Sequence, residues 1–213
     1  MRYKVMKGMI IQKSSPLTMT ISRPQAGGVW LSGLIGALVL LLEWLPNSLE
    51  NLCFDYEAIL AGEYWRLLTG HFVHSSFSHL FWDLLIFMPV SVFLERVSRP
   101  LFVVTLLASM TLISLFLLSS YSQLAAYSGL SGVLYAVMLV AALYWRTKEA
   151  GLWGWVPLIL LSGKTLLELG QHDPLIVSTE WALYSPAHLL GGLSGMAVWV
   201  CWKWVQGTRN KAL

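Results

Sequence analysis

The chain has 213 residues, of which 56% are hydrophobic and only 12% are charged, and it contains eleven Trp. Its mean hydropathy of +0.64 lies well outside the usual make-up of soluble globular domains, so that class is excluded. The net charge of +3 is small and no basic stripe runs along the chain, so nothing indicates a nucleic-acid partner. We therefore expect an integral membrane protein surrounded by the lipid bilayer.

Six predominantly apolar runs approach the length of about 20 residues that a helix needs to cross the hydrocarbon core. They cover residues 28–45, 72–94, 101–120, 127–145, 151–169 and 182–202. Every backbone polar group inside lipid must be satisfied within its own segment, so these runs predict helices. The expected fold class is an all-α membrane protein, a bundle of six transmembrane helices that fills residues 28–205. Residues 1–27 and 206–213 are expected to form tails.

Basic residues predict the orientation of the bundle. Of the fourteen Lys and Arg, twelve lie in the N-terminal tail, at 96–99, at 146–148 or at 203–211. The charged residues of the intervening segments 46–71 and 170–181 are mainly acidic. Loops rich in Lys and Arg stay in the cytoplasm. Both termini and both tails are therefore expected to be cytoplasmic.

Polar residues within the apolar runs are expensive in lipid and usually mark a site. Ser131 lies in the fourth run, His188 in the sixth, and His79 and Asp83 in the second. With both termini inside, these three helices all enter from the outer face. At a rise of about 1.5 Å per residue, the four side chains share a layer roughly 5–15 Å deep, where they can meet.

Small residues recur at four-residue spacing on two of the expected helices, a pattern that lets helix backbones approach closely. The two ridges are Ser128, Gly132 and Ala136, and Ala187, Gly191 and Gly195. Close contact would bring the Ser131 hydroxyl within reach of the His188 imidazole, as a nucleophile and its base require. The plainer alternatives are a serine bonded to its own helix and a histidine with a structural hydrogen bond.

These residues resemble those of the rhomboid intramembrane serine proteases. The similar segments are "YWRLLTGHFVHSSFSHLFWDLL" (64–85), "LER" (94–96), "GLSGVLYA" (129–136) and "AHLLGGLSG" (187–195), in the family's order. The resemblance implies that Ser131 is the catalytic nucleophile, that His188 is its base, and that Tyr135 packs under the histidine. With only these two catalytic residues, no third group orients the base, and no metal or organic cofactor is required.

The resemblance also implies an oxyanion hole, with one departure. The family places a His and, four residues later, an Asn on the second helix to stabilise the oxyanion. His79 matches the first position, but Asp83 stands at the second. An ionised Asp accepts hydrogen bonds and cannot donate them. Either Asp83 is protonated and donates, or it orients His79 and leaves His79 and the Ser131 backbone N–H as donors; we favour the second interpretation.

The compact six-helix form, with Lys164 and Glu168 in the fifth run, also resembles the rhombosortase branch, which is thought to process Gly-Gly-containing C-terminal anchors of exported proteins. We interpret Lys164 and Glu168 themselves as a buried structural ion pair. Trp65, Arg66 and the Glu95-Arg96 pair resemble structural positions of the family.

The expected function is therefore cleavage of single-pass or C-terminally anchored membrane proteins near the outer face. The default location is a bacterial inner membrane, with the site opening toward the periplasmic side. One alternative is a catalytically impaired rhomboid-like protein that only binds membrane segments. A metalloprotease using His71, His74, His79 and Asp83 is a further alternative, although the chain has no His-Glu-x-x-His motif. A transporter would show paired broken helices in two related halves, and the sequence has no such repeat.

Overall fold

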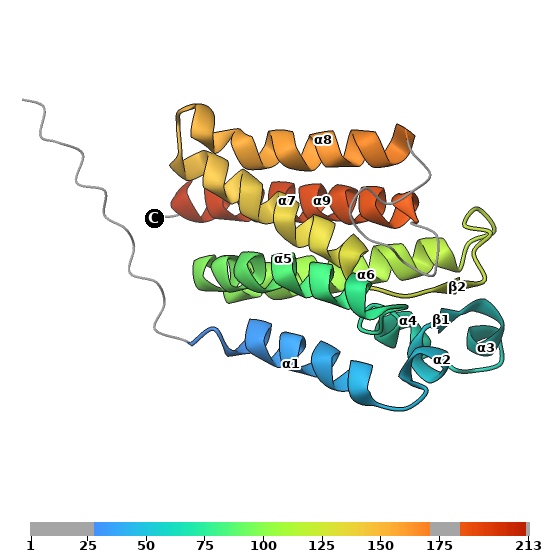
Figure 1. The fold of residues 1–213 in the computed structure, drawn as a ribbon. Helices are drawn as coiled ribbons and strands as arrows, with labels where there is room; N and C mark the ends of the chain where they lie inside the picture. Colours follow the sequence, from blue (N-terminus) through green and yellow to red (C-terminus); the bar gives the residue numbers. More distant parts are fainter. Residues whose placement is uncertain (1–27, 171–183, 212–213) are drawn as a thin grey trace, which may run out of the picture.

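The computed structural model describes residues 28–170 and 184–211, and this part of the chain is a bundle of helices (Figure 1). Each of the six predicted runs overlaps one long helix. The long helices are α1 (Trp30–Trp44), α5 (Phe77–Val97), α6 (Arg99–Leu117), α7 (Ser131–Lys148), α8 (Val156–Gly170) and α9 (Ser185–Lys211). By length and composition, α5 and α6 are able to cross a membrane, and α1 is a shorter apolar helix. The number of membrane crossings and their orientation stay predictions.

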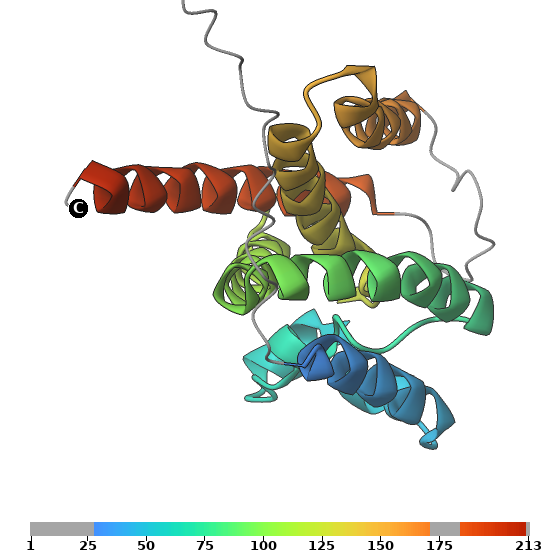
Figure 2. The same ribbon diagram turned by 90° about the vertical axis from the view of Figure 1, so that its left-hand side faces the viewer.

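The two views of the ribbon agree on how these helices are layered (Figures 1 and 2). Helix α1 lies along one edge of the bundle and α8 along the opposite edge. Between them lie α5 and α6, next to α1, and α7 and α9, next to α8. The side chains expected to form the site come from α5, α7 and α9, so the layering brings their helices together.

Several boundaries differ from the expected ones, and each difference has a local cause. Helix α5 begins at Phe77, because the Ser76 side chain accepts a hydrogen bond from the His79 backbone N–H and caps the helix. Helix α7 begins at Ser131, after Gly129 with a φ of +117° interrupts any helical path. We expected the C-terminal tail to begin at residue 206, but helix α9 continues to Lys211.

Short elements fill the segment between α1 and α5 and the approaches to α7 and α8. They are α2 (Ser48–Leu52), β1 (Phe54–Asp55), α3 (Tyr56–Leu60), α4 (Arg66–Thr69), β2 (Ala126–Tyr127) and a 3-10 turn, η1 (Leu152–Gly154). The strands pair antiparallel, with Phe54 opposite Tyr127. This pairing ties the segment before α5 to the segment that leads into α7.

Arg66 and Glu95 are structural, as predicted. The Arg66 guanidinium is buried and donates from Nη1 to the backbone oxygens of Glu50, at 2.7 Å, and Cys53, at 3.0 Å. The Glu95 carboxylate accepts hydrogen bonds from the Ser32 backbone N–H, at 2.9 Å, and from its hydroxyl, at 2.7 Å. Arg66 therefore holds the chain before α4 in place, and Glu95 fastens the start of α1 to the end of α5.

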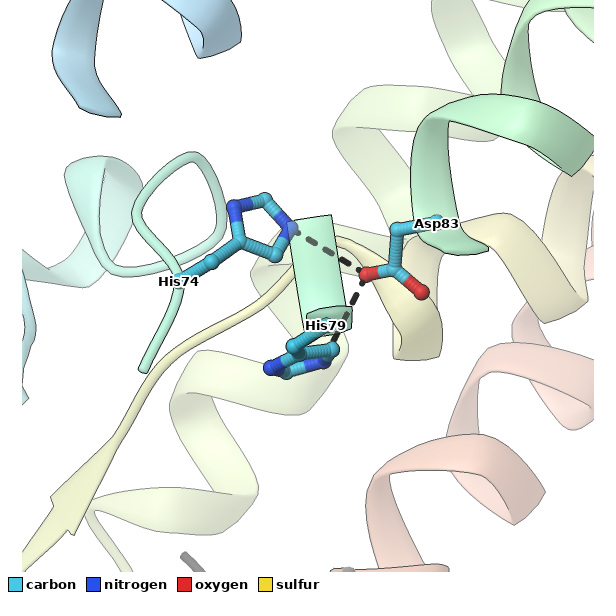
Figure 3. Close-up of side chains that lie close together, drawn as sticks. All are labelled: His74, His79 and Asp83. Atoms are coloured by element: carbon cyan, nitrogen blue, oxygen red, sulfur yellow. Dashed lines mark hydrogen bonds and ion pairs between the residues drawn. The ribbon is translucent and has the colours of Figure 1, made fainter. Parts of the chain in front are cut away.

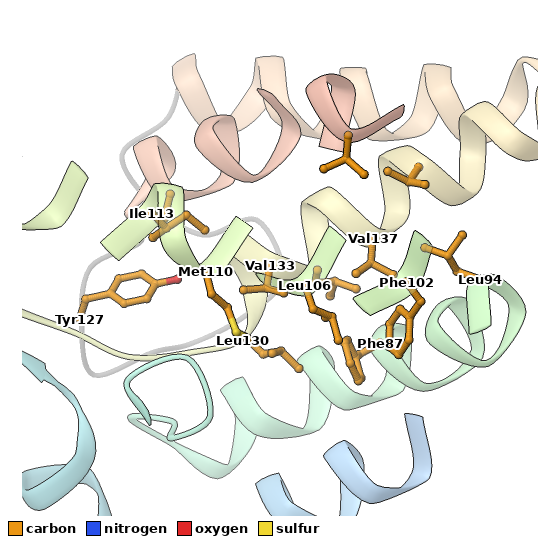
Figure 4. Packing of buried hydrophobic residues seen from close by; sticks show 14 of the residues in the cluster. Phe87, Leu94, Phe102, Leu106, Met110, Ile113, Tyr127, Leu130, Val133 and Val137 are labelled. Atoms are coloured by element: carbon orange, nitrogen blue, oxygen red, sulfur yellow. The ribbon is translucent and has the colours of Figure 1, made fainter. Parts of the chain in front are cut away.

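Helices α7 and α9 make a close contact through the predicted small residues. A Cβ added to Gly191 would lie 1.9 Å from the Gly132 carbonyl oxygen, and one added to Gly132 would lie 3.1 Å from the Ala187 oxygen. Such a separation leaves no room for a side chain at Gly191, so the prediction of a tight contact is confirmed. Beside it, buried side chains such as Phe87, Phe102 and Val137 form the core between α5, α6 and α7 (Figure 4).

Candidate active site

Ser131 and His188 lie at hydrogen-bond distance. Ser131 is the first residue of α7 and His188 lies in the first turn of α9, and His188 Nε2 is 2.8 Å from Ser131 Oγ. The close α7–α9 contact at Gly132 and Gly191 begins one residue after Ser131, which explains why residues 57 positions apart meet. Because the imidazole nitrogen faces the hydroxyl, it is able to accept the serine proton.

The Tyr135 ring supports the His188 imidazole from one helical turn beyond Ser131. The two rings are stacked, with centroids 4.4 Å apart and an interplanar angle of 10°. His188 is only 3% exposed. The expected packing of Tyr135 under the histidine is confirmed, and it restricts rotation of the imidazole.

A third residue orients the base, contrary to our expectation that none does. Glu168 Oε2 lies 2.8 Å from His188 Nδ1, on the opposite side of the ring from Ser131. A carboxylate accepts, so Nδ1 carries the hydrogen and Nε2 is left as the acceptor that faces the serine. Ser131, His188 and Glu168 therefore have the connectivity of a serine–histidine–carboxylate triad.

The predicted ion pair of Lys164 and Glu168 is present, and it belongs to this same arrangement. The Lys164 ammonium contacts Glu168 Oε1 and donates to the Tyr135 hydroxyl at 2.9 Å. The Tyr135 hydroxyl in turn donates to Glu168 Oε2 at 2.6 Å. Three donors thus converge on one buried carboxylate, and they compensate for its removal from water.

The sequence contained a signal for Glu168 that our interpretation did not use. The fifth run is predicted to lead from the cytoplasmic side outward, so Glu168, near its end, is expected close to the outer face. That is the layer to which we assigned Ser131 and His188. An acidic residue at matched depth was therefore a candidate partner for the base, but the sequence could not say which way its helix face pointed.

His79 and Asp83, together with His74, form a second polar cluster at the start of α5 (Figure 3). Asp83 Oδ2 is 3.2 Å from His74 Nε2 and 3.6 Å from His79 Nε2. The same oxygen accepts a hydrogen bond from the Leu130 backbone N–H at 3.1 Å. Asp83 therefore contacts both histidines and the residue immediately before Ser131.

Gly129 allows His79 to approach the start of α7. A Cβ at residue 129 would lie 2.5 Å from His79 Cε1 and 2.8 Å from its Nε2, and the φ of +117° is a conformation that side chains rarely adopt. The His79 imidazole therefore packs directly against the backbone that leads into Ser131. The resemblance leads us to expect the oxyanion in this neighbourhood.

His71 does not belong to this cluster. Its Nε2 lies 3.0 Å from the Ser114 hydroxyl, and burial lowers the pKa of His71 to about 4. Within residues 28–170 and 184–211, only His74, His79 and Asp83 bring three metal-ligating atoms together. Of the four residues that we considered as metal ligands from the sequence, His71 is therefore excluded, and the other three remain candidates.

Comparison with known families identifies the family of the chain. The family model of the Rhomboid domain matches residues 61–204, which is most of the chain. The chain belongs to the rhomboid family. Its members are mostly intramembrane serine proteases, which act on membrane proteins. A search of curated proteins found no match to the chain.

Proposed function

We propose that this rhomboid-family protein is an intramembrane serine endopeptidase in which Ser131 is the nucleophile and His188 is the base. The observation that carries the proposal is the 2.8 Å separation between Ser131 Oγ and His188 Nε2. Burial of His188 and Glu168 strengthens this hydrogen bond and also the bonds that join Glu168 to His188 and to Tyr135. A nucleophile, a base and a carboxylate in series is an arrangement suited to acyl transfer.

The proposed reaction begins when His188 Nε2 takes the proton of Ser131 as Oγ attacks a peptide carbonyl carbon. His188 then carries a positive charge, which Glu168 stabilises through Nδ1–H. The imidazolium gives its Nε2 proton to the departing amine, and an acyl-enzyme ester on Ser131 is left. Water, deprotonated by the same nitrogen, attacks the ester and releases the acid product and the free serine.

The negative charge on the tetrahedral intermediate requires donors near Ser131. Ser131 opens α7, and the first N–H groups of a helix have no partner within the helix and favour negative charge. His79 packs against Gly129 and supplies a second donor in this proposal. Asp83 Oδ2 accepts the Leu130 N–H and faces both His74 and His79, and we assign its carboxylate an orienting role.

The proposed substrates are single-pass or C-terminally anchored membrane proteins. An apolar groove of about 540 Å³ opens among α5, α7 and α8, with Ile86, Phe93, Met138 and Leu160 on its wall. Lys164, whose ammonium contacts Tyr135 and Glu168, also lines the groove. Through Lys164 the groove extends to the side chains that hold Glu168, and we propose that a membrane segment approaches the site along it.

We further propose that cleavage takes place in Gly-Gly-containing anchors, on the outer side of the membrane. The resemblance to rhombosortases favours anchors that contain Gly-Gly, and glycine makes local unwinding of a substrate helix cheaper by about 1 kcal/mol per residue. Unwinding is needed because a stable helix shields its carbonyls. The charge pattern favours six crossings and an active site open to the outer face, in a bacterial inner membrane.

Labelling by a serine-directed fluorophosphonate tests the proposal. We expect full-length protein in detergent to be labelled, and the label to survive replacement of Cys53 and Cys201 by Ala. Ser131→Ala and His188→Ala should each abolish both labelling and cleavage of a transmembrane reporter, because a nucleophile and its base act as one unit. Labelling that persists in Ser131→Ala would reject the assignment. Binding of the reporter without labelling of the wild type would favour a binding-only protein.

A further inference from the structure

We propose that His74, His79 and Asp83 bind a divalent late transition-metal ion, with Zn²⁺ as the ion of choice, and that the bound ion inhibits proteolysis. This site lies at the start of α5, outside the Ser131–His188–Glu168 set. The metal would act as a regulator here, because the catalytic nucleophile is Ser131. Metal binding is independent of the proposed function, and only the inhibition rests on it.

The three ligand atoms already have spacings close to those of a tetrahedral zinc site. Zinc bonds to nitrogen and oxygen are about 2.0–2.1 Å long, so neighbouring ligand atoms around a tetrahedral ion lie about 3.3 Å apart. The two distances from Asp83 Oδ2, to His74 Nε2 and to His79 Nε2, are 3.2 and 3.6 Å. All three ligand atoms lie within 4.8 Å of one another, so small shifts of the side chains would bring them to these spacings.

The side chains are held so that these atoms converge. The side chains of His74 and Asp83 are 1% and 9% exposed, and that of His79 is 14% exposed. The His74 and His79 rings are edge to face, with centroids 5.0 Å apart, and both present Nε2 to the same carboxylate oxygen (Figure 3). The Leu130 N–H also donates to that oxygen, at 3.1 Å. Such a bond to a ligand fixes its orientation and raises metal affinity.

The chemistry of the donors selects the kind of ion. Two imidazole nitrogens and one carboxylate oxygen suit Zn²⁺, Co²⁺ and Ni²⁺. Ca²⁺ and Mg²⁺ prefer six or more oxygen ligands, which this cluster does not supply. The protein provides three ligands, so a tetrahedral ion keeps one position for water.

A metal ion here would inhibit because it takes the nitrogen that the oxyanion needs. The His79 ring packs against Gly129, two residues before Ser131, with Nε2 nearer to that backbone than Nδ1. Nε2 lies 3.6 Å from Asp83 Oδ2, beyond hydrogen-bond distance, so its N–H is left for the oxyanion. Once Nε2 binds a metal ion, it carries no proton and cannot donate to the oxyanion. Zn²⁺ and the tetrahedral intermediate therefore compete for one imidazole nitrogen.

Metal binding is tested on full-length Ser131→Ala protein without a histidine tag, stripped with EDTA, so that the outcome does not depend on catalysis. We expect a single equivalent of Co²⁺ to produce the strong visible absorption of tetrahedral cobalt, and Zn²⁺ to remove it. His74→Gln and Asp83→Asn should each weaken Co²⁺ binding by about tenfold or more. The matched control is His71→Gln, a buried histidine that bonds to Ser114 and should leave the spectrum unchanged. No tetrahedral spectrum, or an equal one in His74→Gln, would overturn the site.

Inhibition is measured separately on protein with Ser131 intact. We expect micromolar Zn²⁺ to stop reporter cleavage, EDTA to restore it, and Mg²⁺ to have no effect. His74→Gln should raise the Zn²⁺ concentration for half-inhibition by about tenfold or more. Unchanged sensitivity of His74→Gln, in protein shown to be folded by its unfolding temperature, would overturn the regulatory role. If the wild type cleaves no reporter, the proposed function fails, while the cobalt experiment still decides the site.

Discussion

Glu168 and His188 come from different helices, and their side chains meet at 2.8 Å, Oε2 to Nδ1, on the side of the imidazole that faces away from Ser131. The Tyr135 hydroxyl donates to the same carboxylate oxygen at 2.6 Å. The carboxylate therefore fixes which nitrogen of His188 carries a hydrogen. A pairing of Ser131 and His188 alone would leave that choice to packing.

Replacement of Glu168 by Gln should lower the turnover of the protease and leave its KM nearly unchanged. Gln keeps the volume but removes the charge that stabilises the protonated base, and a hydrogen bond to a charged group contributes about 1.5–3 kcal/mol. Turnover should then fall by about tenfold to hundredfold. Steady-state cleavage of a transmembrane reporter in detergent measures both constants.

Tyr135→Phe is the matched comparison for this change. It keeps the ring that stacks on His188 and removes only the hydroxyl that contacts Glu168 and Lys164. We expect a smaller loss of turnover than in Glu168→Gln. A Glu168→Gln enzyme with normal turnover would show that Glu168 serves packing alone.

Gly191→Ala should destabilise the bundle and separate the catalytic residues. The added Cβ would lie 1.9 Å from the Gly132 oxygen, so α7 and α9 must move apart. Overpacking of this kind costs about 1–3 kcal/mol. We expect a lower unfolding temperature in detergent and the loss of fluorophosphonate labelling. Gly192→Ala is the control, because a Cβ there would have no neighbour within 4 Å. Equal stability of the two variants would contradict the close contact.

Asp83→Asn separates the two roles considered for Asp83. If the carboxylate orients His79, the amide loses the charged contact to His79 at 3.6 Å and the charge-assisted bond to His74 at 3.2 Å. Such a bond contributes about 1.5–3 kcal/mol, so cleavage should fall by about tenfold to hundredfold. We favour this outcome because one oxygen, Asp83 Oδ2, accepts the Leu130 N–H and also faces both histidines, which suits a carboxylate. The assay uses metal-free buffer, so that bound Zn²⁺ has no influence. Cleavage as fast as that of the wild type would assign Asp83 the donor role instead.

The predicted topology can be read from single cysteines in a variant without Cys53 and Cys201. Asn51 and Thr147 are both exposed in the structure, and they lie in segments that we expect on opposite sides of the membrane. A membrane-impermeant thiol reagent added to intact cells should label Asn51→Cys. Thr147→Cys should react only after the cells are opened. The reverse pattern would place the active site on the cytoplasmic side.

The sequence by itself indicated the class of the protein and much of the candidate site. Apolar runs long enough to cross a membrane predicted where the helices lie, because the bilayer imposes their length. The four-residue spacing of small residues predicted the α7–α9 contact, since helical periodicity puts such residues on one face. That contact is what joins Ser131 to His188, and both residues were found from their polarity in an apolar setting.

Only the tertiary structure decided the partners whose approach depends on how helices rotate and tilt. Glu168 was visible in the sequence, but its pairing with His188 depends on which face α8 turns toward α9. His74, which lies before α5 begins, joins Asp83 because the chain folds back across the start of that helix. Spacing along one helix determines which residues share a face, whereas contacts between elements depend on packing that many distant residues determine together. The sequence could therefore identify candidate residues one by one, but not the contacts that join Glu168 to the base and His74 to Asp83.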